Sequence, residues 1–505
     1  MLFNSHLFIF AYLPIVFIGF FVISKSNSSL GMLWLGISSL FFYGWWNPKF
    51  VSLLMASIVL NYFFGNLIAR LNKNQSRILL VTALVLNISL LIYFKYANFF
   101  LSNIVGLGEN YSTLEIILPL GISFFTFTQI AFLVDVYKGI AREFNFLQYM
   151  LFVTWFPHLI AGPVLHHKQM MPQFSRPETF RPNIESISIG LSLFALGLAK
   201  KVLLADQFSM YASPLFGQAA SGDHLMLVSA WFAALAYTLQ LYFDFSGYSD
   251  MAVGLSRIFN IKLPINFDSP YKSKNIIEFW RRWHITLSVF LREYLYIPLG
   301  GNRKGKIRRY SNLMITMLLG GLWHGAGWNF ILWGAIHGFL LVINYLWRGI
   351  VSENLHNSTR LSRGLSIFIT FVAVVFAWVP FRATSIEATF SIWGGMLGLN
   401  GISVATSLQS SLAPMGVGLL FSGWFPGTAL PIFEVISWIG FGLFIIWVLP
   451  NTQELFAKFS PAFDEVSGSY FSWKLTPIYG VMAGLLLAIS IIFISKASEF
   501  LYFQF

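Results

Sequence analysis

The stretch MITMLLGGLWHGAGWNFILWGAIHG, Met314–Gly338, decides the fold prediction for this chain. It lies inside a run from Tyr310 to Trp347 that contains no Asp, Glu, Lys or Arg. Because one membrane span needs roughly 20 apolar residues, this run is long enough for a membrane hairpin or for one broken span. Its central glycines allow backbones to approach closely and a helix to break.

His324 lies near the middle of this run. It follows Arg309 by 15 residues, which is about 22 Å along a helix. An ionisable side chain at that membrane depth is costly and indicates a function by default, although an imidazole can also simply hydrogen-bond a neighbouring helix. His337 would be rotated by about 220° from His324 on one continuous helix, so the two share a face only if the helix breaks.

The composition places the rest of the chain in the membrane as well. Of 505 residues, 56% are hydrophobic and 10% are charged, which is typical of an all-α polytopic membrane protein. We predict one membrane domain over residues 1–505, with about 11 to 13 helices, some of them re-entrant. A core lies at about residues 120–340, and residues 400–475 are predicted to be peripheral.

Basic residues are concentrated in one block. Residues 262–309 contain 11 Lys and Arg against Asp268, Glu278 and Glu293, so the positive-inside rule predicts that the block is cytoplasmic. It would meet membrane lipid headgroups or an anionic soluble substrate, and we expect no nucleic acid partner. Within it, Ile276–Tyr296 is predicted to be an amphipathic interfacial helix, with Glu278 paired to a nearby arginine.

Other polar residues give weaker signals. Asp244 and Asp250 are six residues apart and face different sides of a helix, so they satisfy buried donors or pair with a base such as Arg282 rather than form an acid–base dyad. Three histidines lie in Phe152–Gln173, a short segment that Pro and Gly interrupt and that we interpret as re-entrant. They have no i, i+4 pairing or carboxylate partner, so we predict no metal site. The chain has no cysteine, which excludes a cysteine acyl-enzyme.

Five stretches together resemble the bacterial branch of the membrane-bound O-acyltransferase (MBOAT) family. That branch includes the membrane subunits for alginate, cellulose and peptidoglycan O-acetylation and the D-alanyl transfer protein of teichoic acid modification. The stretches are Pro157–Pro163 (PHLIAGP), Leu241–Leu255 (LYFDFSGYSDMAVGL), Phe279–Ser288 (FWRRWHITLS), Tyr296–Gly305 (YIPLGGNRKG) and Gly321–Gly338 (GLWHGAGWNFILWGAIHG).

The resemblance implies an MBOAT-like helical bundle with a central tunnel. His324, in Trp-His-Gly, matches the catalytic histidine of the family, and His284, in Arg-Trp-His, matches its second site position. His324 would act as general base or accept the acyl group itself, while His284 would hold the thioester or stabilise the oxyanion. We further predict that six residues bind substrate: Trp323, Arg282, Asp244, Tyr248, Asn329 and His158.

The implied activity is transfer of an acetyl group from a cytosolic thioester, acetyl-CoA, across the inner membrane. The acceptor would be an extracytoplasmic polysaccharide or a partner protein, and relatives in this branch work with an extracytoplasmic SGNH-type acyltransferase. No cofactor is expected beyond the donor. Val164–His167 follows the AGP motif where the alginate subunit would have an arginine, so cellulose, peptidoglycan or another envelope glycan is as plausible an acceptor as alginate.

Three alternatives stay open from the sequence. The first is D-alanyl-type transfer from a carrier-protein thioester. The second is a transporter of a polysaccharide precursor in which His324 relays protons. The third is a structural subunit that docks an enzyme.

Overall fold

A computed structural model of the chain describes residues 1–103, 116–141, 145–160, 162–350, 359–402, 432–494 and 500–501. Within these ranges the regular structure is helical, apart from one isolated antiparallel bridge between Phe267 and Trp283. The all-α prediction is therefore confirmed. Of the peripheral region predicted at 400–475, residues 403–431 lie outside the described residues.

Five helices in the described ranges are long and apolar enough to cross a membrane. Five shorter apolar helices accompany them, so the polytopic membrane prediction is confirmed, whereas the total of 11 to 13 helices and the tunnel stay predictions. The five long helices are α3 (Lys49–Arg70), α4 (Lys73–Asn103), the combined helix Ile184–Ala220, α15 (Trp328–Ile350) and α16 (Arg360–Arg382).

The chain divides into two compact units. Unit 1 comprises Met1–Ala199, Gly247–Asn266 and Thr452–Gln504, and unit 2 comprises Lys200–Ser246 and Phe267–Asn451. Helix α11 (Leu227–Ile258) runs without interruption from unit 2 into unit 1.

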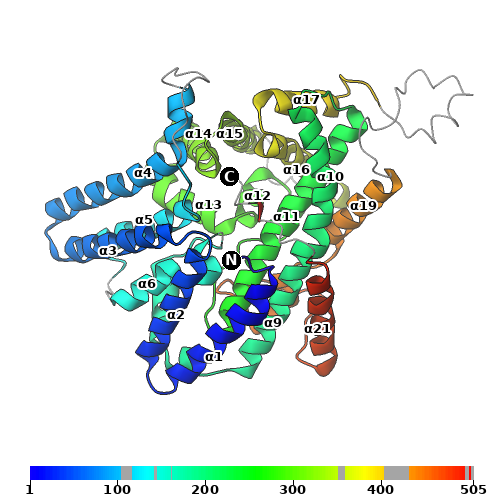
Figure 1. Cartoon of the computed structure of the whole chain (residues 1–505). Helices are drawn as coiled ribbons and strands as arrows, with labels where there is room; N and C mark the ends of the chain where they lie inside the picture. Colours follow the sequence, from blue (N-terminus) through cyan, green and yellow to red (C-terminus); the bar gives the residue numbers. More distant parts are fainter. Residues whose placement is uncertain are drawn as a thin grey trace, which may run out of the picture. The chain divides into compact units, whose positions relative to one another are not determined.

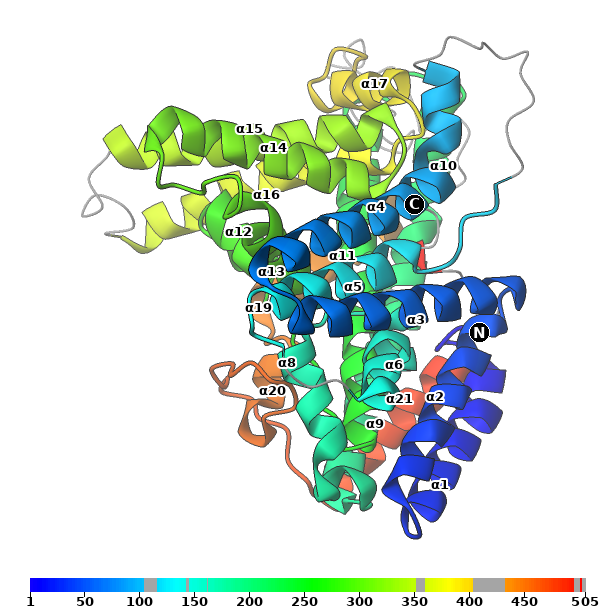
Figure 2. The ribbon, with the colours of Figure 1, turned by 90° about the vertical axis from the view of Figure 1, so that its left-hand side faces the viewer.

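Unit 1 contains the first part of the chain. In it α1 packs on α2, and α3, α4 and α5 lie side by side (Figures 1 and 2). Asn61 on α3 and Asn87 on α4 exchange two amide hydrogen bonds of 2.7 and 3.1 Å, which satisfies both side chains between apolar helices. Its helices are α1 (Leu13–Ser24), α2 (Ser28–Gly44), α3, α4, α5 (Ile122–Tyr137), α6 (Phe146–Thr154), α7 (Phe156–Leu159), α8 (His167–Met170), α9 (Ile184–Ala199), α20 (Thr452–Leu455) and α21 (Pro477–Ile492).

Unit 2 contains the stretch from which the sequence analysis started. The run Tyr310–Trp347 forms a hairpin, because the two helices α14 (Gly305–His324) and α15 lie along one another (Figure 2). The other elements are the π-helical turn η4 (Lys200–Ala205), α10 (Asp206–Ala220), α12 (Ile276–Arg282), α13 (Ile285–Leu291), the π-helical turn η6 (Arg292–Tyr296), α14 (Gly305–His324), α16, α17 (Ile386–Met396) and α19 (Ile432–Val448).

One predicted element is wrong. Ile276–Tyr296 is not a single amphipathic interfacial helix but consists of α12, α13 and η6, with a break at Trp283 and His284 between α12 and α13. Trp280 and Trp283 are buried against other aromatic rings of unit 2. The apolar residues of this segment surround it on several sides, so it packs inside the unit instead of presenting one face to lipid.

Candidate active site

The hairpin places His324 at the end of a helix. His324 is the last residue of α14, Gly325 after it is extended, and α15 begins at Trp328. The helices approach so closely that a Cβ added to Gly321 would lie 2.1 Å from the carbonyl oxygen of Phe330. Glycine is therefore required on α14 one turn before His324, and the same crossing positions the histidine.

His284 lies in the break between α12 and α13. Its backbone is in the left-handed region, with φ 43° and ψ 54°, and its side chain is buried. A non-glycine residue in this conformation costs free energy and is often found at functional sites. Burial lowers the pKa of His284 to about 3, so its imidazole is neutral at physiological pH.

Aromatic rings bring the two histidines together, although 40 residues separate them in the sequence. The ring of Trp323 lies 6.2 Å from His284 and 4.8 Å from His324, measured between ring centroids. The ring of Phe245 also contacts His284, with 4.8 Å between ring centroids and an interplanar angle of 90°. The structure thus places both predicted catalytic histidines and Trp323 in one cluster of unit 2.

Three members of this cluster were not among the predicted site residues. Trp333 and Phe381 lie 5.0 and 5.1 Å from the ring of His324, and Trp333 also lies 4.8 Å from His337. His337 is fully buried, and neither of its ring nitrogens has a hydrogen-bond partner among the described residues. The i, i+4 spacing of Trp333 and His337 was the available signal, because it puts both on one face of α15.

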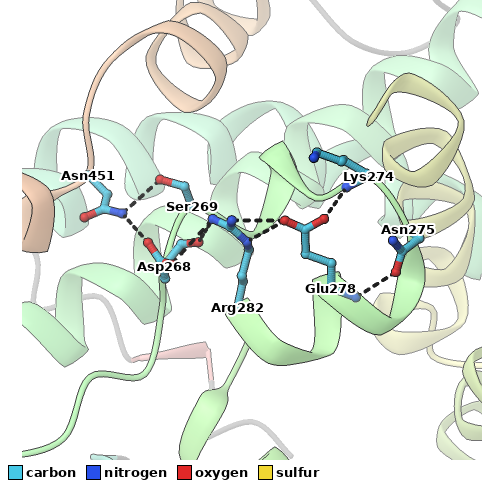
Figure 3. A network of polar contacts seen from close by, with 7 residues as sticks. All are labelled: Asp268, Ser269, Lys274, Asn275, Glu278, Arg282 and Asn451. Atoms are coloured by element: carbon cyan, nitrogen blue, oxygen red, sulfur yellow. Dashed lines mark hydrogen bonds and ion pairs between the residues drawn. The ribbon is translucent and has the colours of Figure 1, made fainter. Parts of the chain in front are cut away.

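Arg282 is engaged in a polar network that fastens α12 (Figure 3). Its guanidinium contacts Glu278 at 3.0 Å and the carboxylate of Asp268 at 3.5 Å. Asp268 also accepts a hydrogen bond of 3.0 Å from Asn451. The predicted pairing of Glu278 with an arginine is confirmed. Arg282 is the residue two before His284, so the network holds the end of the helix from which His284 emerges.

A polar pocket opens beside this network. It has a volume of about 480 Å³ and is lined by four basic and two acidic side chains, with Asn275 and Ile277 between them. Arg281 and Arg348, two of the basic residues, are exposed. The lining has a net charge of +2, which suits an anionic ligand. The charged residues are Asp268, Lys274, Glu278, Arg281, Arg282 and Arg348.

The other predicted site residues have identifiable surroundings. Asp244 pairs with Lys201 at 2.7 Å, which corrects the suggested partner Arg282. Asp244 Oδ1, on α11, contacts a lysine that lies 43 residues earlier in the chain, and helical periodicity does not reveal such a contact. Asn329 donates a hydrogen bond of 2.6 Å to the carbonyl oxygen of Ala383.

The remaining two residues belong to unit 1. The ring of Tyr248 stacks on Phe3 at 4.9 Å and makes a tilted contact with Phe500 at 4.4 Å, measured between ring centroids. His158, on the short helix α7, contacts the carbonyl oxygen of Phe152 at 2.9 Å through Nε2, and burial lowers its pKa to about 4. The substrate-binding roles of all six residues stay predictions. In the described ranges, no three His, Asp or Glu side chains gather closely enough to hold a metal ion.

The sequence of the chain matches known proteins over most of its length. The profile of "MBOAT, membrane-bound O-acyltransferase family" matches residues 78–383, which include the two histidines predicted to be catalytic. The chain belongs to the membrane-bound O-acyltransferase family. It is an acyltransferase enzyme and a multi-pass membrane protein.

Relatives of this MBOAT chain include enzymes of envelope modification. It is 41% identical to the peptidoglycan O-acetyltransferase of Helicobacter pylori over 100% of this chain and 98% of the relative. It is 40% identical to the probable alginate O-acetylase AlgI of Pseudomonas aeruginosa, with 83% and 79% of the two chains covered. It is also 30% identical to the teichoic acid D-alanyltransferase of Streptococcus thermophilus, over 52% of this chain and 68% of the relative.

Proposed function

We propose that this chain transfers an acetyl group from acetyl-CoA in the cytosol to a hydroxyl group of an extracytoplasmic acceptor. The observation that carries the proposal is the convergence of His284 and His324 on Trp323 in a buried aromatic cluster. Such a cluster supplies two imidazoles and excludes bulk water, as acyl transfer to a sugar hydroxyl rather than to water requires. The identity to a peptidoglycan O-acetyltransferase over the whole chain supports acetyl as the group transferred.

In the proposed reaction, neutral His324 accepts the proton of the attacking hydroxyl group. The oxygen forms a bond to the thioester carbonyl carbon, and negative charge develops on the carbonyl oxygen. Neutral His284 donates one N–H, which can stabilise that oxyanion. The C–S bond then breaks, and the imidazolium of His324 returns its proton to the leaving thiolate. The alternative order, in which His324 first carries the acetyl group, uses the same two side chains.

The pocket beside α12 is suited to the phosphate groups of the donor. Its net charge of +2 and its exposed residues Arg281 and Arg348 favour an anion, and charge-assisted hydrogen bonds from arginine to phosphate are strong. Arg282, which lines the pocket, precedes His284 by two residues in the chain. A donor held there by its nucleotide would extend its thioester toward the histidines.

For the acceptor, we propose an envelope polysaccharide, reached directly or through an extracytoplasmic SGNH-type partner enzyme. The enzyme would then lie in the inner membrane. The names of the relatives from Helicobacter pylori and Pseudomonas aeruginosa support an envelope glycan.

Thioester cleavage by the purified chain tests the proposal. We would incubate it with radiolabelled acetyl-CoA and compare His324→Ala and His284→Ala with His224→Ala, an exposed histidine of the same unit that serves as the matched control. We expect CoA release in the wild type and in His224→Ala, and none above background in His324→Ala. Full turnover by His324→Ala would refute the assigned role.

D-alanyl transfer is the second candidate, because a teichoic acid D-alanyltransferase is among the relatives. The same assay with a D-alanyl carrier-protein thioester separates the two. Cleavage of the carrier thioester without cleavage of acetyl-CoA would replace the acetyl proposal.

A further inference from the structure

A buried ion pair lies in unit 2 outside the histidine cluster. Lys201 Nζ is 2.7 Å from Asp244 and 2.8 Å from Asp206, and the side chains of Lys201 and Asp244 are 5% and 1% exposed. Lys201 lies in the combined helix Ile184–Ala220, which is long and apolar enough to span a membrane. Ionisable side chains in such a segment are costly and indicate function rather than stability.

The backbone at Lys201 is specialised for this contact. The turn Lys200–Ala205 is π-helical, so its hydrogen bonds run from residue i to i+5. This winding brings Lys201 and Asp206, which are five residues apart, next to one another. Short π-helical turns inside α-helices are frequent at functional sites.

The partner on α11 connects the ion pair to the site. Phe245 follows Asp244 directly, and its ring meets His284 edge-on at 4.8 Å and an interplanar angle of 90°. Phe245 also contacts Phe267 at 4.9 Å, and Phe267 forms the isolated bridge with Trp283, the residue before His284. Phe245 therefore touches both His284 and the segment that holds its strained backbone.

We propose that the Lys201–Asp244 ion pair is a positioning element for acyl transfer, which holds α11 so that Phe245 keeps the His284 ring in place. The inference rests on the function proposed above. Lys201 holds the carboxylate of Asp244 in place. This contact fixes the position of Phe245, the next residue, along the axis of α11 and its rotation about that axis. A ring placed edge-on against an imidazole restricts its rotation, and loosening a catalytic group by about 1 Å costs roughly 100-fold in rate.

Two carboxylates on the same lysine provide a matched pair of variants. Asp244→Asn removes the charge beside Phe245, whereas Asp206→Asn removes the charge from a side chain that is 31% exposed and lies on α10. We expect kcat of thioester cleavage to fall at least roughly 10-fold in Asp244→Asn, with KM for acetyl-CoA unchanged, and to stay within about twofold in Asp206→Asn. A purely structural ion pair would lower the amount of folded protein and leave turnover per folded molecule unchanged.

A double-mutant cycle tests the connection through Phe245. Phe245→Leu keeps the ion pair but removes the ring edge, so its effect and that of Asp244→Asn should not add. Asp244→Asn leaves the buried lysine charge without this carboxylate and could prevent folding. The second variant is therefore Lys201→Met/Asp244→Asn, in which both side chains are uncharged. Wild-type kcat in this double variant, or additive effects in the cycle, would overturn the proposal.

A readout that needs no turnover separates this inference from the proposed function. Diethyl pyrocarbonate modifies accessible imidazoles, and His284 is 1% exposed. Peptide mass spectrometry should find faster modification of His284 in Asp244→Asn and Phe245→Leu than in the wild type or Asp206→Asn. Equal rates in all four proteins would refute positioning, whereas wild type that cleaves no acetyl-CoA would refute only the proposed function.

Discussion

The closest backbone contact in the hairpin gives a sharp prediction for Gly321→Ala. The new methyl group would lie 2.1 Å from the carbonyl oxygen of Phe330, which is 1.3 Å short of the 3.4 Å at which ordinary contact begins. The clash is with backbone, so no side-chain rotation relieves it. The helices α14 and α15 must therefore separate by about 1 Å, at a cost of about 1–3 kcal/mol in folding free energy.

This separation would act directly on the histidine cluster. His324 follows Gly321 by one turn on α14, while its neighbour Trp333 is on α15. Moving one helix from the other by about 1 Å would displace His324, the proposed base, from the reacting atoms, and we expect thioester turnover to fall roughly 100-fold, equal to about 2.7 kcal/mol in the barrier.

The assay is CoA release per folded molecule, together with thermal unfolding in detergent. The matched control is Gly327→Ala, whose methyl group would lie 3.6 Å from the Phe330 ring, an ordinary contact. Gly334→Ala, which would meet the carbonyl oxygen of Met317 at 2.3 Å, should reproduce the defect from the opposite helix. If Gly321→Ala turns over as fast as Gly327→Ala, the helix contact does not position His324, and the reasoning is wrong.

Three further predictions follow from the same unit. The pKa of His284 is lowered to about 3 from 6.5, so the unfolded chain binds a proton as pH falls below 6.5 while the folded chain does not, and stability is lost. His284→Asn should therefore remove about 2 kcal/mol of pH dependence from the free energy of unfolding, measured between pH 7 and 5. Arg282→Lys should lower turnover several-fold, since lysine cannot bridge Glu278 and Asp268 as a guanidinium does, whereas Arg308→Lys, at an exposed arginine that does not line the pocket, should not. Asn329→Leu should cost about 1–3 kcal/mol in thermal unfolding, because it leaves the carbonyl oxygen of Ala383 without its donor.

Prediction from the sequence worked best where the signal was local. The uncharged run Tyr310–Trp347 with its central glycines indicated a hairpin or a broken span, and the structure contains the hairpin. The prediction of one continuous helix over Ile276–Tyr296 was wrong because the backbone conformation of a single residue decides the structure there. The apolar residues of that segment fit a helical repeat, which predicts one continuous helix. The left-handed backbone of His284 interrupts the helix, and a hydrophobic repeat cannot reveal a single residue with positive φ.

Distant contacts were the other source of error. Asp244 was assigned a basic partner of the correct kind, but the partner is Lys201 and not Arg282. His337 was set apart from His324 by the geometry of one continuous helix. The break at Gly325 changes that relation, so both histidines contact Trp333.

The amino-acid sequence by itself determined the class of this protein. The free energy of moving a segment into lipid depends on that segment's own composition, so consecutive residues are enough to predict an all-α membrane protein. The family motifs are equally local, and they are the basis on which His324 and His284 are predicted to be site residues. Only the tertiary structure decided that Trp323, the neighbour of His324, lies against His284, because that contact joins residues far apart in the sequence and no local pattern specifies it.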